Sequence, residues 1–175
     1  MAVSALLAGI ENHLRTDYFK LYMNTAIIRM TVIGYVGITA SDKGIRRISF
    51  LKKKVKPVTS SNPILKKTVK ELELYEQGKL KTFSVPVDIR ILPDFTKRVL
   101  NAVKKVGYGD LITYSQLASA IKNKNAVRAV GNALGKNPVP IIIPCHRVIR
   151  TDGSIGGYGP GVNIKKKLLR IEKRD

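Results

Sequence analysis

The only cysteine of the chain, Cys145, lies between a proline and a histidine in N-P-V-P-I-I-I-P-C-H-R-V, residues 137–148. A thiol attacks as its thiolate, and because its free pKa is about 8.5 it needs a base or a positive charge nearby to react at neutral pH. His146 and Arg147, the next two residues, are of the types that supply both. The apolar run before Cys145 allows a second interpretation, since free cysteines are among the most buried residue types. The segment therefore predicts either a nucleophile or a core residue.

For His146 to act on Cys145, the backbone between them has to turn, because successive side chains of an extended strand point to opposite faces. Pro144 favours a turn, since its ring fixes its own φ and restricts the residue before it. We therefore expect a local turn to bring the thiol and the imidazole together, directly or through a water molecule.

A carboxylate that could complete this pair stands near the end of the chain. The stretch N-I-K-K-K-L-L-R-I-E-K-R, residues 163–174, predicts a helix capped by Asn163, with its apolar stripe on one face and its lysines opposite. Glu172 falls at the edge of that stripe. It could orient His146 as the third member of a Cys-His-Glu relay, or it could be a glutamate on the wet edge of an amphipathic helix.

Two short helices joined by a turn are predicted upstream of the cysteine. The first begins with a capping box, in which Thr113 precedes Gln116 by three residues. The second covers A-V-R-A-V-G-N-A-L-G, residues 126–135, and we expect Gly135 to end it. The buried faces of the pair are formed by Leu117, Ala118, Ile121, Val127, Val130 and Leu134.

The remaining surface of the second helix has mostly small side chains. It carries Arg128, Ala129, Gly131, Asn132 and Ala133. Small residues with one arginine are typical of a helix that enters a DNA groove, where the arginine can meet phosphate, a base edge or an opened stack. The alternative is a helix packed closely against another helix through its small residues.

A glycine-rich loop follows the cysteine segment. T-D-G-S-I-G-G-Y-G-P-G, residues 151–161, contains five glycines, and Tyr158 is its one large flat side chain. The Gly-Lys-Ser/Thr ending of a phosphate-binding loop is absent. The loop therefore predicts a contact to a base, or a lid, in preference to a nucleotide cradle.

The composition narrows the classes of function. The chain carries 32 Lys and Arg against 12 Asp and Glu, a net charge of +20, which favours polyanionic partners such as DNA, although a solvated lysine-rich surface of a heat-adapted protein is the alternative. One cysteine makes no internal disulfide, and two histidines at no ligand spacing predict neither a metal site nor a cofactor. No apolar run approaches the roughly 20 residues of a membrane span, so we expect a cytoplasmic protein, nucleoid-associated if prokaryotic.

The first half of the chain reads as a small α/β unit. Residues 28–40 and 45–51 are predicted as two strands joined by a turn at 41–44. Asn62-Pro63 predicts a helix start, with a helix to about Gln77 that carries Leu65, Val69, Leu72 and Glu76 on one stripe and stops at Gly78. Alternating residues 83–89 predict an edge strand, because Pro86 cannot donate to a ladder.

The second half is mostly helical. Apolar residues at helical spacing predict a helix from Phe95 to Val106, ended by residues 107–109. We expect a domain boundary at the Leu92-Pro93 step, which gives an N-terminal domain of residues 1–92 and a C-terminal domain of residues 93–175.

These motifs together resemble the alkylguanine-DNA alkyltransferases, which repair guanine alkylated on its exocyclic oxygen. The resemblance rests on residues 128–133, the whole of residues 137–148, the Gly-Gly-Tyr at 156–158, Thr113-Tyr114 upstream and Glu172 downstream. It covers residues 93–173 closely and the first 92 loosely. It implies an α+β protein: a small N-terminal α/β domain with a short antiparallel sheet, and a mostly helical helix-turn-helix, winged-helix-like domain that carries the active site.

The resemblance also implies roles for particular residues. Cys145 is the alkyl acceptor, His146 the base that deprotonates it through a water, Glu172 the partner that orients His146, Asn137 the hinge that stabilises the turn, and Tyr114 the donor to the purine ring. The DNA contacts fall to Arg128, as a finger in the gap left by the base, and to Ala129, Gly131, Asn132, Thr113 and Ser115. The base pocket is lined by Pro140, Val148, Tyr158, Gly159 and Leu134. The cysteines and histidines of the family's zinc-bound members are missing from the first half.

The implied reaction is consistent with elementary chemistry. A stacked base hides its alkyl group, so the nucleotide has to rotate out of the duplex before the thiolate attacks. The product thioether is a poor leaving group, so each molecule reacts once. The expected partner is double-stranded DNA containing alkylated guanine, and we expect a monomer. Two alternatives remain: a helix-turn-helix protein that binds DNA or lesions with an inert Cys145, and a Cys-His hydrolase with a basic surface.

Overall fold

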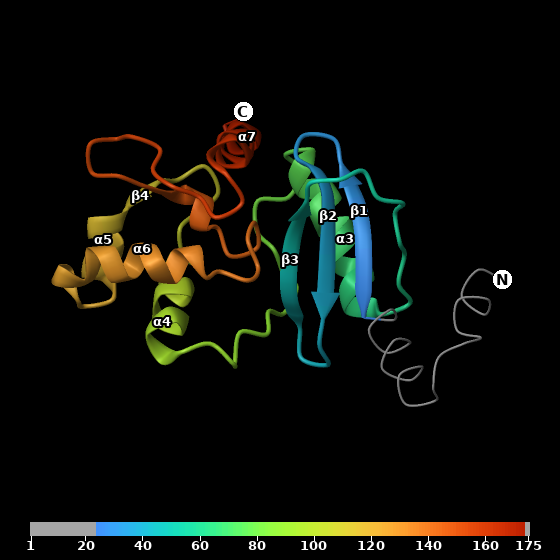
Figure 1. Ribbon diagram of the computed structural model, residues 1–175, viewed down its shortest axis with the longest axis horizontal. Helices are drawn as coiled ribbons and strands as arrows, with labels where there is room; N and C mark the ends of the chain where they lie inside the picture. The colour runs from blue at the N-terminus through green and yellow to red at the C-terminus, as the bar shows by residue number, and fades with distance from the viewer. Residues whose placement is uncertain (1–23, 174–175) are drawn as a thin grey trace.

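A computed structural model describes residues 24–173 of the chain. A three-stranded sheet with one helix behind it forms one part, and a group of helices around the cysteine segment forms the other (Figure 1). The described residues thus have an α+β fold, as predicted, with five α-helices and a small antiparallel sheet. No helix in this part of the chain is long and apolar enough to cross a membrane.

The sheet has three strands where the sequence predicted two. Strands β1 (Thr25–Met30), β2 (Gly34–Ala40) and β3 (Ile45–Leu51) pair antiparallel in the order β1-β2-β3. The single strand predicted over residues 28–40 is wrong, because the chain reverses at residues 31–33 and continues at Gly34 with a φ of +96°. The predicted turn at 41–44 is confirmed, with the Ser41 amide donating to the Gly44 carbonyl at 2.8 Å.

Helix α3 (Pro63–Glu76) covers one face of this sheet. It begins as predicted, because Asn62 accepts from the amide of Ile64 at 2.8 Å and Pro63 needs no hydrogen bond at the first helical position. Gly78, with a φ of +75°, follows its end. The predicted apolar stripe is partly wrong. Glu76 instead accepts from the amides of Thr31 and Val32, at 3.0 and 2.7 Å, and so stabilises the turn that divides β1 from β2.

Residues 83–89 do not form the predicted edge strand. Only one bridge forms, in which the Ile45 amide donates to the Pro86 carbonyl at 2.9 Å and the Asp88 amide donates to the Ile45 carbonyl at 2.8 Å. Pro86 has no amide hydrogen with which to extend the ladder. A Cβ on Gly44 would lie 2.6 Å from the Pro86 carbonyl oxygen, so the close approach of these two segments requires glycine at position 44.

The second part begins with helix α4 (Asp94–Val103), which ends three residues before the predicted Val106. Helix α5 (Tyr114–Ala120), the 3-10 turn η1 (Lys124–Ala126) and helix α6 (Val127–Gly135) then form the predicted helix-turn-helix pair. Both hydrogen bonds of the capping box are present, with Thr113 accepting from the Gln116 amide at 3.1 Å and Gln116 accepting from the Thr113 amide at 2.8 Å. Helix α6 ends at Gly135, as predicted.

The C-terminal helix α7 (Val162–Glu172) departs from two predictions. Its N-cap is Gly161, with a φ of +109°, so Asn163 lies inside the first turn and is not the cap. Lys165 is fully buried, whereas the sequence placed every lysine of this helix on the outer face. Two short strands, β4 (Ile112–Thr113) and β5 (Val148–Ile149), pair in parallel between α5 and α7.

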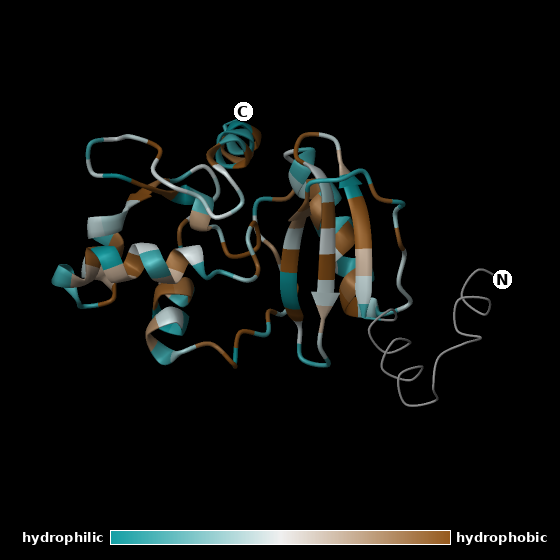
Figure 2. Ribbon diagram, in the orientation of Figure 1, coloured by the Kyte–Doolittle hydropathy of each residue, from teal (hydrophilic) through white to brown (hydrophobic). Residues whose placement is uncertain are grey.

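One hydrophobic core joins the two parts. Hydrophobic and polar residues alternate along the strands, and hydrophobic residues also mark the chain between the sheet and the helices (Figure 2). The Ile48 amide of β3 donates to the Pro138 carbonyl at 2.8 Å, which ties the sheet to the start of the cysteine segment. The sheet therefore supports the cysteine segment from behind.

Candidate active site

The segment of residues 137–148 is a compact buried turn. The Asn137 side chain closes it, donating to the Ile143 carbonyl at 2.9 Å and to Cys145 Sγ at 3.0 Å, and accepting from the Val139 amide at 3.0 Å. Ile141 adopts a φ of +76°, which costs free energy for a β-branched residue, and its complete burial holds it there. Asn137 thus links the end of α6 to the cysteine, where the sequence placed a hinge.

Cys145, His146 and Arg147 form the 3-10 turn η2 (Cys145–Arg147), so the predicted local turn is present. All three side chains are buried, and the thiol retains 8% of its exposure. Burial is the main cause that raises the pKa of Cys145, while the hydrogen bond from Asn137 and the charge of Lys165 act in the opposite direction. The resting group is therefore a neutral thiol that needs a base.

The thiol lies at the wall of a cavity of about 210 Å³. Of the predicted pocket residues, Leu134, Tyr158 and Gly159 line it, together with Tyr114, while Pro140 and Val148 do not. Its other lining residues are Gly131, Gly135, Gly157 and Cys145. Four glycines among eight lining residues leave open the space that side chains would fill.

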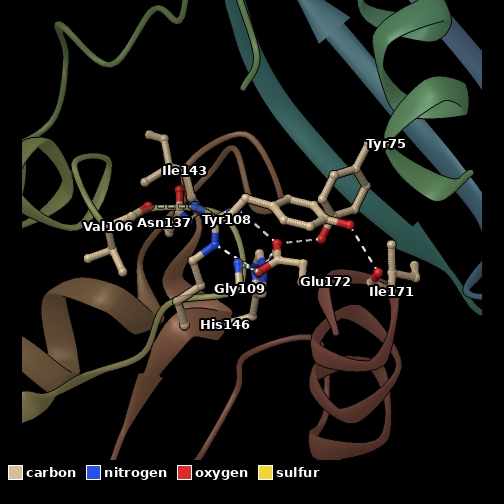
Figure 3. Close-up of polar contacts among 10 residues, drawn as sticks. Tyr75, Val106, Tyr108, Gly109, Asn137, Ile143, His146, Ile171 and Glu172 are labelled. Atoms are coloured by element: carbon tan, nitrogen blue, oxygen red, sulfur yellow. Dashed lines mark hydrogen bonds and ion pairs between the residues drawn. The ribbon is translucent and has the colours of Figure 1, made fainter. Parts of the chain in front are cut away.

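Glu172 is the centre of a buried polar cluster that includes His146 (Figure 3). Its Oε1 accepts from His146 Nε2 at 2.8 Å, from Arg147 Nη2 at 2.9 Å and from the Tyr75 hydroxyl at 2.8 Å. Its Oε2 accepts from Arg147 Nε at 2.9 Å and from the Gly109 amide at 3.3 Å. At 3% exposure Glu172 is not on the wet edge of α7, so the second interpretation of this residue is wrong.

These contacts determine the protonation of the cluster. Burial alone raises the pKa of Glu172, but the hydrogen bonds from His146 and Arg147 outweigh it and hold the pKa at about 2. Burial lowers the pKa of His146, partly offset by Glu172. The imidazole is therefore neutral at pH 7, and its buried Nδ1 has no hydrogen-bond partner among the described residues. A neutral ring with Nε2 donating to a carboxylate and Nδ1 vacant is a proton acceptor.

Lys165 joins the cysteine segment to the glycine-rich loop. Its ammonium donates to the Val148 carbonyl at 2.5 Å and to the Gly157 carbonyl at 3.4 Å, and burial lowers its pKa to about 8. The Tyr158 hydroxyl is also buried, and it has no hydrogen-bond partner among the described residues although it is close enough to Cys145 to interact with it electrostatically. Within residues 24–173 no three side chains of the metal-binding types gather.

The predicted DNA-binding residues lie on two elements, helix α6 and the start of helix α5. Arg128, Ala129 and Asn132 are exposed on α6. Gly131 faces the Tyr114 ring, which would lie 3.8 Å from a Cβ at that position. Thr113 caps α5, and Ser115 Oγ lies 3.1 Å from Thr151 Oγ1. The exposed surface of α6 and the cavity of Cys145 therefore adjoin through Gly131, Leu134 and Gly135.

Sequence reasoning gave no role in the site to Tyr75 or Lys165, and it considered Arg147 only as a positive charge near Cys145. Arg147 was visible as the neighbour of His146, but its two hydrogen bonds to Glu172 depend on where α7 packs. Lys165 follows the helical spacing of the apolar stripe, since it lies three residues before Leu168, and that position was a usable signal. Tyr75 is 97 residues from Glu172, and no local pattern indicates its contact.

Comparison with known proteins gives a consistent result. Residues 94–174 match the family model of the 6-O-methylguanine DNA methyltransferase DNA binding domain, and residues 18–89 match that of the ribonuclease-like domain. A methylated-DNA–protein-cysteine methyltransferase of Methanosarcina acetivorans is 37% identical over 148 residues, which cover 80% of this chain and 92% of that protein.

Solved structures of this family have a similar fold. Mycobacterium tuberculosis OGT, in a crystal structure with DNA, is 35% identical with a TM-score of 0.75, over 84% of this chain and 91% of that one. The O6-methylguanine-DNA methyltransferase of Pyrococcus kodakaraensis is 31% identical with a TM-score of 0.60, over 85% of this chain and 98% of that one. The chain therefore belongs to the 6-O-methylguanine DNA methyltransferase family.

Proposed function

We propose that Cys145 removes the alkyl group from the exocyclic oxygen of alkylated guanine in duplex DNA and keeps it. The observation that carries this proposal is a buried thiol at the wall of a cavity, followed in the same 3-10 turn by a neutral His146 that Glu172 holds. The cavity adjoins α6, whose exposed residues are small apart from Arg128 and Asn132. A base rotated out of the duplex beside α6 would enter next to the sulfur.

The reaction follows from the proton positions. His146 Nδ1 takes the thiol proton through one water, and Glu172 stabilises the imidazolium that forms. The thiolate attacks the alkyl carbon, so the S–C bond forms as the C–O bond to guanine breaks. The Tyr114 hydroxyl, whose pKa is raised mainly by burial, stays protonated and donates to the purine ring as negative charge develops there. The guanine anion finally takes up one proton on a ring nitrogen, which balances the proton that His146 removed from the thiol, and a normal guanine remains in the DNA.

The acceptor is consumed in this scheme. A thioether has no route back to a thiol among the groups in the site, so one molecule repairs one lesion. The enzyme is thus its own substrate, and no cofactor is needed.

Several properties of the whole chain are part of the proposal. We propose a monomer that acts in the cytoplasm, on the nucleoid if the cell is prokaryotic, and that divides into domains at residues 92 and 93. The helix-turn-helix with β4, β5 and the loop at 151–161 makes the C-terminal domain winged-helix-like. The charge of +20 favours DNA binding that weakens as salt rises and depends little on sequence.

An intact mass tests the central step. After mixing with duplex DNA that carries 6-O-methylguanine, the protein should gain one methyl group, about 14 Da, located on Cys145 by peptide mapping and never exceeding one per chain. Cys145→Ser is the control and should bind the DNA without gaining mass. An unchanged wild-type mass with the lesion intact would favour a DNA-binding protein with an inert cysteine, and repeated turnover would favour a hydrolase.

A second experiment tests the finger role of Arg128. Arg128→Ala should slow repair of a duplex lesion by about 10-fold or more while leaving the reaction with free 6-O-methylguanine base unchanged, because only the duplex has a gap to fill. Lys124→Ala removes a neighbouring exposed positive charge and is the matched control for electrostatic attraction alone. Equal losses with duplex and free base, or equal losses in both variants, would contradict the finger.

A further inference from the structure

The polar cluster contains one residue from the N-terminal half of the chain. Tyr75 lies one residue before the end of α3, on the helix that covers the sheet, and is fully buried. Its hydroxyl donates to Glu172 Oε1 at 2.8 Å, the same oxygen that accepts from His146 (Figure 3). The sheet-bearing half of the molecule therefore contacts the proposed relay directly.

We propose that Tyr75 is a positioning residue, through which helix α3 fixes the orientation and the charge of Glu172 and thereby the basicity of His146. The inference deepens the proposed function and rests on it, because it assumes that His146 is the base and Glu172 its partner. It assigns the N-terminal half a part in the chemistry beyond support of the fold.

The position of the Tyr75 hydroxyl is fixed by packing. The Tyr75 ring packs edge-on against Tyr108, with centroids 6.0 Å apart and planes at 83°, and against Phe83 at 5.4 Å. Tyr108 in turn donates its hydroxyl to the Ile171 carbonyl at 2.9 Å, one residue before Glu172. The aromatic cluster thus joins the end of α3 to the end of α7 and leaves the hydroxyl little freedom to turn away.

Three hydrogen-bond donors share the negative charge of one carboxylate oxygen of Glu172. Glu172 Oε1 accepts from three donors, of which Arg147 and Tyr75 compete with His146 for its negative charge. Burial, followed by the charge of Glu172, raises the pKa of Tyr75, so it remains a neutral donor at every pH at which the protein works. Without its hydroxyl, more of the negative charge would face the imidazole. His146 would then hold a proton more strongly.

Other ionisable groups surround His146 and are unchanged by this substitution. Glu172 and Lys165 face it from α7, Arg147 lies in its own turn, and the Tyr158 ring packs edge-on against it with centroids 6.5 Å apart. Because these groups stay in place, a shift that follows loss of the Tyr75 hydroxyl is attributable to that hydroxyl.

The test compares Tyr75→Phe with Tyr108→Phe in the full-length protein. Both remove one hydroxyl from the same aromatic cluster, but only the first removes a donor to the carboxylate. The readout is the single-turnover rate of methyl transfer from duplex 6-O-methylguanine, measured across pH at saturating DNA. We expect Tyr75→Phe to be slower by about tenfold at neutral pH and to move the acid midpoint of the rate about half a unit to higher pH, with DNA affinity unchanged. Tyr108→Phe should keep the wild-type midpoint.

A double variant shows whether Tyr75 acts through the carboxylate. In a Glu172→Gln background, Tyr75→Phe should have no further effect on the rate, because its partner charge is already gone. The inference is overturned if Tyr75→Phe keeps the wild-type rate and midpoint, if Tyr108→Phe shifts them equally, or if the two substitutions add independently. Failure of the proposed function is a different outcome: the wild-type protein itself would gain no methyl group.

Discussion

Two regions of opposite construction are connected by the turn of Cys145 and His146. Cys145 belongs to the cavity, which is also lined by four glycines, two tyrosines and Leu134, and where the Tyr158 hydroxyl has no hydrogen-bond partner among the described residues. His146 belongs to the Glu172 cluster, where one carboxylate accepts five hydrogen bonds from four residues. The first region, the cavity, is hollow, and the second is filled by side chains that hydrogen bonds join to one another.

This difference follows from what each region has to do. A region that admits a base and releases it gains from an absence of side chains and from polar atoms left for the ligand. A region that holds a buried charge needs every lone pair satisfied, because an unpaired buried charge is costly. We therefore expect substitutions in the cluster to damage both chemistry and stability, and substitutions at the cavity to act mainly by filling space.

The largest predicted effect is that of Glu172→Gln. The amide has nearly the same shape, but it cannot neutralise Arg147 or stabilise an imidazolium on His146. We expect the methyl-transfer rate to fall about 100-fold and the free energy of unfolding to fall by about 3 kcal/mol. Single-turnover kinetics and urea denaturation measure the two quantities.

The matched control is Glu71→Gln. Glu71 is also a buried glutamate, and its carboxylate accepts from the Ser84 amide at 3.0 Å, far along the chain from the site. This variant should lose stability while keeping the wild-type rate per folded molecule. A similar loss of rate in both variants would show that the cluster acts through stability alone.

The two regions also differ in how far the sequence predicted them. Cys145, His146 and Glu172 were recognisable because their types suit one reaction and because two of them are adjacent. The capping box at Thr113 and the cap at Asn62 were predictable because both motifs are local. By contrast, Tyr75 reaches Glu172 only because the fold brings the end of α3 beside the end of α7, which no spacing encodes.

Most of the errors also concern contacts that no local pattern encodes. Residues 28–40 have the composition of one strand, and what divides them is a carboxylate from Glu76, on a different element. Asn163 is a good cap by type, but the cap is Gly161, which has a positive φ, so α7 starts two residues earlier. Lys165 was assigned to solvent by its charge, although two carbonyls in the interior accept its hydrogen bonds. The errors at residues 28–40 and at Lys165 thus concern contacts made across the fold, and the error at Asn163 concerns a local backbone conformation.

The second prediction concerns the loop that borders the cavity. Gly156 has a φ of +68°, and a Cβ there would lie 3.3 Å from both Cε2 and the hydroxyl oxygen of Tyr114. Gly156→Ala should press on the proposed donor and slow methyl transfer about fivefold, with a loss of about 1 kcal/mol in stability from the left-handed backbone. Both values are smaller than those for Glu172→Gln.

Gly153→Ala separates the two causes. Gly153 lies in the same loop with a φ of +79°, but a Cβ there would meet nothing within 4 Å. It should lose the same stability and keep the wild-type rate. Equal rates in the two alanine variants would mean that the Tyr114 ring moves aside for the added methyl group. The wall of the cavity would then be more mobile than its close contacts indicate.

The smallest predicted effect is a pH dependence of stability that arises in the filled region alone. Burial lowers the pKa of His146 in the folded protein below its value of about 6.5 in the unfolded chain. Below that pH the unfolded chain therefore binds a proton that the folded protein does not, so stability falls as the pH falls.

Between pH 7.5 and 5.5 the carboxylates stay ionised, and the loss assigned to His146 should be about 1 kcal/mol. Urea midpoints across this range measure it. His146→Asn should remove most of the slope, because an amide does not titrate and only the onset of Lys165 titration near pH 8 remains, whereas Gly156→Ala should lower stability equally at every pH. A slope of the wild-type size in His146→Asn would assign the effect to a group outside the cluster. The filled region would then contribute no more than the hollow region to the pH dependence of stability.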